Sequence, residues 1–208
     1  MIRNVLAALC FCVFAHAASA AEFSQAERAD LARVSVYLNS INSAEGRFVQ
    51  IGPDGKSDEG MFYLRKPGRL RFEYDAPNPT VVVSDGTTIA VENARLRTTD
   101  RYPLVDSPLR LLLSEDIDLT ADPRIVAVMR QDGALTMTAR QAQGPAQGEI
   151  TLVFADSGSS LELRQWEVLD AQGLRTLVAL ASLTEGVEIP ARHFIIQDLD
   201  PFSSSRAN

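Results

Sequence analysis

Turn signals recur about every 8–15 residues along most of this chain, and the segments between them often alternate in polarity. In Arg69–Tyr74 the alternation is complete, so Leu70, Phe72 and Tyr74 would share one face of a strand. The turn signals combine Gly with Pro, Asp, Ser or Gln at 52–55, 85–86, 131–133, 156–158 and 171–173. This pattern is typical of a meandering antiparallel sheet.

We therefore predict a mainly β fold in which a curled antiparallel sheet of about 11 strands forms an open barrel. The expected strands are 44–51, 60–66, 69–74, 81–84, 87–91, 125–130, 135–140, 148–155, 160–169, 174–183 and 193–197. The inner face would carry Phe48, Phe62 or Tyr63, Leu70, Phe72, Tyr74, Val82 and Phe154. Such a sheet either fills its interior with side chains or encloses a ligand beneath a covering helix.

Two segments have helical rather than strand spacing. Residues 24–40 begin with a capping box, Ser24 and Glu27, and carry an apolar stripe of Leu31, Val34, Leu38 and Ile41. Residues 108–114 form a shorter expected helix, with Leu109, Leu112 and Leu113 on one face. These leucines are either ordinary core residues or the underside of a movable lid.

The first 20 residues (MIRNVLAALCFCVFAHAASA) have the features of a signal peptide, namely a basic start, a short apolar core and an A-x-A site. We predict cleavage after Ala20, export to a periplasm, a single domain over 21–202 and a frayed tail over 203–208. Both cysteines and His16 leave with the signal peptide, so the mature chain has no cysteine and one histidine, His193. Disulfides and cysteine chemistry are thereby excluded.

The remaining composition argues against most catalytic and nucleic-acid-binding roles. The formal net charge of −7 disfavours nucleic acid as a partner. His193 is the only candidate base, and the chain has no G-x-S-x-G motif. Glu115, Asp116 and Asp118 lack the spacing of a calcium loop and are expected to be a solvated loop. We predict no enzyme activity, no metal and no cofactor.

A basic run, 65–71 (RKPGRLR), stands out on an acidic chain. Its bases either punctuate a surface turn or form a patch that docks a partner or holds a covering helix. The candidates for that second role are Arg65, Lys66 and Arg69.

These segments also resemble the LolA-like family of periplasmic outer-membrane lipoprotein carriers. The resemblance lies in 48–50 (FVQ), 60–74 (GMFYLRKPGRLRFEY), 83–88 (VSDGTT), 102–104 (YPL) and 107–113 (SPLRLLL). It implies an open barrel capped by an N-terminal helix and short lid helices around an apolar cavity. The cavity residues would be Leu31, Val34, Leu38, Phe48, Phe62, Leu64, Leu70, Phe72, Tyr74 and Val82, beneath a lid of Leu109, Leu112 and Leu113.

The resemblance further implies a monomeric carrier that takes triacylated lipoproteins from an inner-membrane ABC transporter to an outer-membrane lipoprotein receptor. The family commonly has Arg where this chain has Lys66, so the lid latch is weaker or lies at Arg65 or Arg69. Cys10 and Cys12 lack the small preceding residue of a lipidation site, which favours the carrier over its lipid-anchored receptor relative. The alternatives are a lipocalin-like binder of another lipid or small apolar ligand, and a β-rich hydrolase with buried carboxylates.

Overall fold

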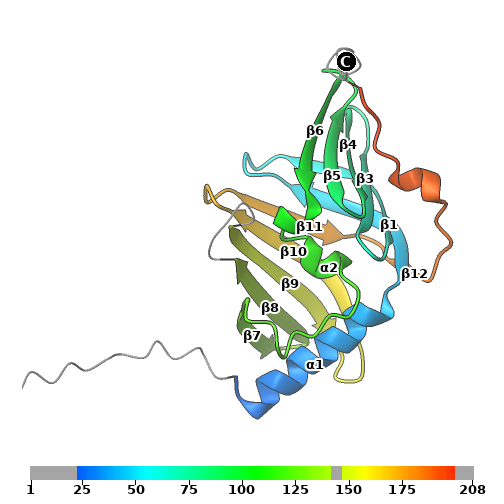
Figure 1. The fold of residues 1–208 in the computed structure, drawn as a ribbon. Coiled ribbons are helices and arrows are strands. Elements are labelled where there is room, and N and C mark those ends of the chain that lie inside the picture. The colour runs from blue at the N-terminus through cyan, green and yellow to red at the C-terminus, as the bar shows by residue number, and fades with distance from the viewer. Residues whose placement is uncertain (1–22, 142–146, 200–208) are drawn as a thin grey trace, which may run out of the picture.

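The computed structural model describes residues 23–141 and 147–199, and within them a single antiparallel sheet dominates (Figure 1). The predicted signal peptide with its cleavage site and the predicted frayed tail lie outside the described residues. The strands are β1 Ser43–Ile51, β2 Ser57–Arg65, β3 Arg69–Tyr74, β4 Thr80–Asp85, β5 Thr88–Asn93, β6 Thr98–Pro103, β7 Ile125–Gln131, β8 Ala134–Gln141, β9 Gly148–Asp156, β10 Leu161–Asp170, β11 Arg175–Leu180 and β12 Thr184–Glu185. The helices are α1 Gln25–Ser40 and α2 Arg110–Leu113, with 3-10 turns η1 Leu104–Asp106 and η2 Ala191–Phe194.

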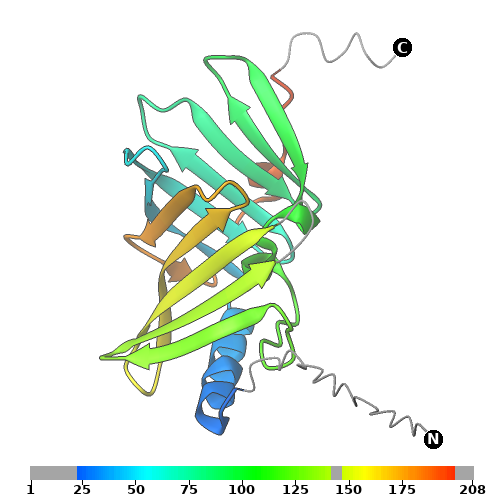
Figure 2. The ribbon, with the colours of Figure 1, turned by 90° about the vertical axis from the view of Figure 1, so that its left-hand side faces the viewer.

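The sheet runs in the order β6-β5-β4-β3-β2-β1-β11-β10-β9-β8-β7, and β12 adds a short pairing to β1. Its two ends, β6 and β7, do not pair with each other, so the sheet curls without closing. The predicted mainly β, open antiparallel architecture is confirmed. In the side view, β7–β10 cross in front of α1, which lies on the inner side of the curl (Figure 2).

The N-terminal helix begins where the capping box predicts. The Ser24 hydroxyl accepts a hydrogen bond from the Glu27 amide at 3.2 Å, and the Ser24 amide donates to the Glu27 carboxylate at 2.7 Å. The apolar stripe of α1 is buried, with Leu31, Val34 and Leu38 at 2% exposure or less. This stripe holds the helix against the inner face of the sheet.

The expected strand over 193–197 is wrong. Residues Ala191–Phe194 form the 3-10 turn η2 after Pro190, and only Phe194 is buried there. One buried anchor does not make a period-2 pattern, so the segment has no reason to extend as a strand. Strand β6, in contrast, is present but was not predicted. Its polar sequence (TTDRYP) shows no alternation of apolar and polar residues.

Candidate functional site

An apolar cavity lies between the C-terminal turn of α1, the inner face of the sheet and α2. Its volume is about 40 Å³. Eight of the predicted cavity and lid residues line it: Leu38, Phe62, Leu64, Leu70, Phe72, Leu109, Leu112 and Leu113. The wall is completed by Ile41, Ala44, Lys66, Leu163, Trp166, Leu180 and Leu183.

Five other predicted cavity residues lie elsewhere. Leu31 and Val34 are fully buried on the earlier turns of α1, and Phe48 is buried beneath the cavity wall. Tyr74 and Val82 pack against the core from partly buried positions. For Leu31 and Val34 the physical reason is that α1 crosses the sheet obliquely, so only its last turn reaches the cavity while its earlier turns pack in the core (Figure 1).

Phe72 is the centre of an aromatic cluster in the cavity wall. Its ring centroid lies 4.8 Å from that of Phe48, 6.1 Å from Phe62 and 6.1 Å from Trp166. These separations suit edge-to-face and tilted ring packing. Phe62, rather than Tyr63, points inward. Phe62 is 3% exposed, whereas the Tyr63 ring lies tilted against the His193 ring, with the ring centroids 4.8 Å apart.

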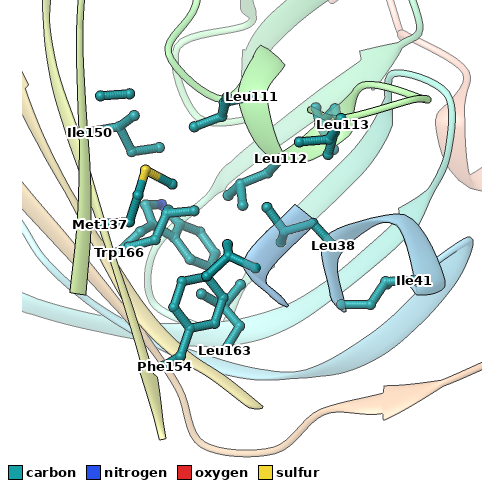
Figure 3. Close-up of a cluster of buried hydrophobic side chains, with 14 of the residues drawn as sticks. Leu38, Ile41, Leu111, Leu112, Leu113, Met137, Ile150, Phe154, Leu163 and Trp166 are labelled. Carbon is teal, nitrogen blue, oxygen red and sulfur yellow. The ribbon is translucent and has the colours of Figure 1, made fainter. Parts of the chain in front are cut away.

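Trp166 and Leu163 were missed by the sequence reasoning because β10 contains a bulge. Strict alternation would put residues three apart on opposite faces of a strand. The pairing of β10 with β9 shifts register between Leu163 and Gln165, so Leu163 lies opposite Phe154 and Trp166 opposite Leu152. The extra residue turns both side chains inward. Figure 3 shows both of them on the sheet side of the cluster.

The short helix α2 covers the cavity. Leu112 and Leu113 are 7% and 2% exposed, and Figure 3 shows Leu112 and Leu38 pointing into the same cluster. The Gly68 amide, in the turn between β2 and β3, donates to the Leu113 carbonyl at 2.9 Å. Gly68 has a φ of +73°, which favours glycine, and this conformation brings its N–H to the end of α2. This cover therefore consists of leucine packing and one main-chain hydrogen bond from that turn.

The three basic candidates point to different places. Lys66 Nζ donates to the Leu38 carbonyl at 2.7 Å, so it contacts the end of α1 rather than α2. Burial lowers the pKa of the Lys66 ammonium group to about 8. Arg65 donates to the Ile189 carbonyl at 2.9 Å and covers the Phe194 ring, while Arg69 lies opposite Asp85 in the ladder of β3 and β4.

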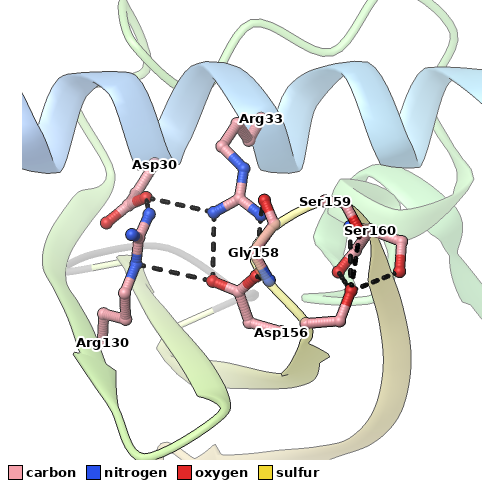
Figure 4. A network of polar contacts seen from close by, with 8 residues as sticks. Asp30, Arg33, Arg130, Asp156, Gly158, Ser159 and Ser160 are labelled. Atoms are coloured by element: carbon pink, nitrogen blue, oxygen red, sulfur yellow. Dashed lines mark hydrogen bonds and ion pairs between the residues drawn. The ribbon is translucent and has the colours of Figure 1, made fainter.

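A network of side-chain ion pairs attaches α1 to strands β7 and β9 (Figure 4). Arg33 of α1 forms a two-pronged contact with Asp156 at 2.7 and 3.0 Å, and Arg130 of β7 pairs with Asp30. Arg33 holds the pKa of the Asp156 carboxyl group well below its usual range. The network lies away from the cavity and fixes the helix whose last turn forms part of the cavity wall.

The described residues contain no group of three or more His, Cys, Asp or Glu side chains placed to hold a metal ion. No helix in the same ranges is long and apolar enough to cross a membrane. The cavity wall itself consists of hydrocarbon side chains apart from Lys66 and the indole N–H of Trp166.

The chain is similar in sequence to a family of known proteins. The family model "Outer membrane lipoprotein carrier protein LolA" matches residues 39–197. An outer-membrane lipoprotein carrier protein of Alkalilimnicola ehrlichii is 31% identical over 188 residues, covering 83% of this chain and 80% of that relative. One of Chromohalobacter salexigens is 28% identical over 182 residues, covering 84% and 85%.

Among solved structures, a LolA superfamily protein from Nitrosomonas europaea matches with a TM-score of 0.45 and 9% identity, over 82% of this chain and 97% of that chain. The family model spans well over half of this chain, and the Alkalilimnicola relative is similar along most of both lengths. This chain belongs to the LolA family of outer-membrane lipoprotein carrier proteins.

Proposed function

We propose that this protein is a periplasmic carrier that holds the acyl chains of triacylated lipoproteins in its apolar cavity. It receives them from an inner-membrane ABC transporter and delivers them to the outer membrane, where a lipoprotein receptor is the expected acceptor. It acts as a monomer and catalyses no reaction. The observation that carries the proposal is a hydrocarbon-walled cavity beneath a leucine-rich helix in a chain of the carrier family.

The size of the cavity implies that α2 moves during loading. A cavity of about 40 Å³ has room for no more than a few water molecules. A lipid acyl chain is far larger, so it enters only when the leucines of α2 leave the wall. Those leucines pack without directional bonds, and their place in the wall can be taken by another hydrocarbon surface.

The energetics favour a carrier that exchanges one apolar environment for another. Burial of three chains of roughly 16 carbons, at about 0.8 kcal/mol per CH₂, would total about 35–40 kcal/mol, beyond the practical ceiling near 20 kcal/mol for non-covalent binding. Transfer from a membrane to the cavity replaces one hydrocarbon contact by another, so the net difference is small. Lid contacts and partner docking can then decide the direction of transfer.

A release assay tests the proposal. Proteoliposomes that contain the lipoprotein-releasing ABC transporter and a triacylated lipoprotein would be incubated with ATP and the purified mature protein. We expect the lipoprotein to appear in the soluble fraction bound to the carrier. Leu109→Glu, at the partly exposed rim of the cavity, should abolish release, whereas Ile51→Glu, on an exposed strand end, should not.

Two results would contradict the proposal. One is that no lipoprotein leaves the membrane when carrier and ATP are both present. The other is that the protein binds a small free lipid and ignores lipoprotein, which would favour the lipocalin-like alternative.

A further inference from the structure

The chain that follows α2 is attached to α1 by side-chain hydrogen bonds to its backbone. The Asn39 amide nitrogen donates to the Ile117 carbonyl at 2.9 Å, and its oxygen accepts from the Ile117 N–H at 2.8 Å. One side chain thus satisfies both backbone polar groups of one residue. This is the pairing that a neighbouring strand would otherwise provide.

Ser35 makes a second attachment one turn earlier on α1. Its hydroxyl donates to the Leu31 carbonyl at 2.8 Å and accepts from the Leu119 N–H at 2.9 Å. Ser35 is 8% exposed and Leu119 is 1% exposed, so both partners are out of water. Separation of this pair would leave a buried donor without an acceptor, which is costly.

α2 itself has fewer hydrogen bonds to the rest of the fold and is held mainly by its leucines. Within the described ranges, α2 makes one hydrogen bond to a segment distant in the chain, from the Gly68 N–H to the Leu113 carbonyl. Between Leu113 and Ile117 the backbone turns at Asp116, which has a φ of +51°. A helix held by one such hydrogen bond and by non-directional leucine packing is therefore joined by a short turn to residues that three hydrogen bonds attach to α1.

We propose that Ser35 and Asn39 are positioning residues that hold residues 117–119 on α1 as the pivot about which α2 opens. The inference rests on the proposed function only in that opening admits an acyl chain, because the pivot is a property of the chain alone. During opening, the hydrogen bond from Gly68 breaks and the bonds from Ser35 and Asn39 persist. The helix then returns to the same place over the cavity when it closes.

Native-state hydrogen exchange of the mature protein, at increasing urea below the unfolding transition, tests the pivot. The Gly68 and Ser114 amides should exchange through a local opening, about tenfold or more faster than the Ile117 and Leu119 amides. The latter two should exchange only with the global unfolding of the protein. Exchange of all four amides at one rate, through one opening, would overturn the proposal.

Matched variants separate positioning from simple stabilisation. Ser35→Ala and Asn39→Ala should speed exchange at Ile117 or Leu119 and raise the affinity for the apolar dye anilinonaphthalene sulfonate severalfold. Asn39→Asp keeps the acceptor for the Ile117 N–H and should restore part of the protection at that amide. Ser43→Ala removes a comparable bond, from the Ser43 hydroxyl to the Val187 carbonyl at 2.7 Å, and should leave dye affinity unchanged.

If Asn39→Ala changes stability but neither dye affinity nor the exchange of the Gly68 and Ser114 amides, which report on the opening of α2, these residues only stabilise the fold and the proposal is wrong. None of these measurements uses a lipoprotein. The protein could fail to bind lipoprotein and still show fast exchange at the Gly68 and Ser114 amides with slow exchange at the Ile117 and Leu119 amides. That result would refute the proposed function and leave the pivot intact.

Discussion

Lys66 introduces an ammonium group into a cavity wall whose other side chains are hydrocarbon apart from the indole N–H of Trp166. It donates to the Leu38 carbonyl near the C-terminal end of α1, and this carbonyl also accepts the C-cap hydrogen bond from the Ile41 N–H at 3.3 Å. A cation is favoured at this end of a helix. The position is one where the resemblance to the carrier family suggested a lid latch. In this structure the residue caps α1, and the backbone of Gly68 contacts α2 instead.

The buried position of Lys66 should make stability depend on pH in the alkaline range. Its folded pKa of about 8 lies below the unfolded value of 10.5, so the unfolded chain binds more protons between these values. The free energy of unfolding should therefore rise from pH 8 toward pH 10, by about 1–2 kcal/mol. The pKa of Tyr37 and of Tyr74 is raised to about 12, so these groups oppose the rise only above pH 10.

Urea unfolding at pH 7.5 and 9.5 checks this. Lys66→Met should remove the rise, whereas Lys56→Met, at an exposed side chain paired with Asp54, should keep it. An equal rise in wild type and Lys66→Met would show that another group titrates.

At the scale of elements, α1 is held at three places along its length. The ion network with Arg130 and Asp156 fixes its first half, the bonds to 117–119 fix its second half, and Lys66 caps its end. A helix held in this way is a rigid support against which the short α2 can move.

Asp156→Asn should weaken the first of these attachments. It removes the charge that faces Arg33 and Arg130 while keeping the shape of the side chain. The urea midpoint should fall at neutral pH. Since the folded pKa of Asp156 lies below 3.8, its stabilisation is present above that pH and is lost as pH falls, so the difference from wild type should narrow below pH 3.8.

Glu167→Gln breaks the exposed pair with Arg175 and is the matched control. It should leave the midpoint nearly unchanged, because exposed ion pairs contribute little. Equal effects of the two substitutions would show that the network does not fasten α1.

Local sequence patterns predicted those elements whose buried face or end is determined by neighbouring residues in the chain. Alternation predicted β3, and the capping box predicted the start of α1. The bulge in β10, which turns both Leu163 and Trp166 inward, follows from pairing with β9 and leaves no local signature. Likewise, Leu31 and Leu38 are equivalent members of the apolar stripe of α1. The position of the helix over the sheet determines that Leu38 lines the cavity while Leu31 packs in the core.

At the scale of the whole molecule, the cavity is continuous with the hydrophobic core. Phe62, Phe72 and Leu113 belong both to the cavity wall and to the buried cluster that holds the fold together. The proposed opening of α2 would withdraw part of that cluster, so it requires the rest of the protein to remain folded without it. The sheet can supply this stability because its ladder of antiparallel strands runs uninterrupted from β6 to β7 without help from α2.

Native mass spectrometry of the protein co-expressed with a triacylated lipoprotein measures whether the cavity binds lipoprotein. A one-to-one complex is predicted for wild type and for Ile51→Glu, and its loss for Phe72→Glu and Leu70→Glu in the cavity wall. Leu109→Glu, at the partly exposed rim, should lose the complex even if the deeper variants fail to fold. A wild-type protein that stays a bare monomer, or a complex that survives all three cavity substitutions, would contradict the account.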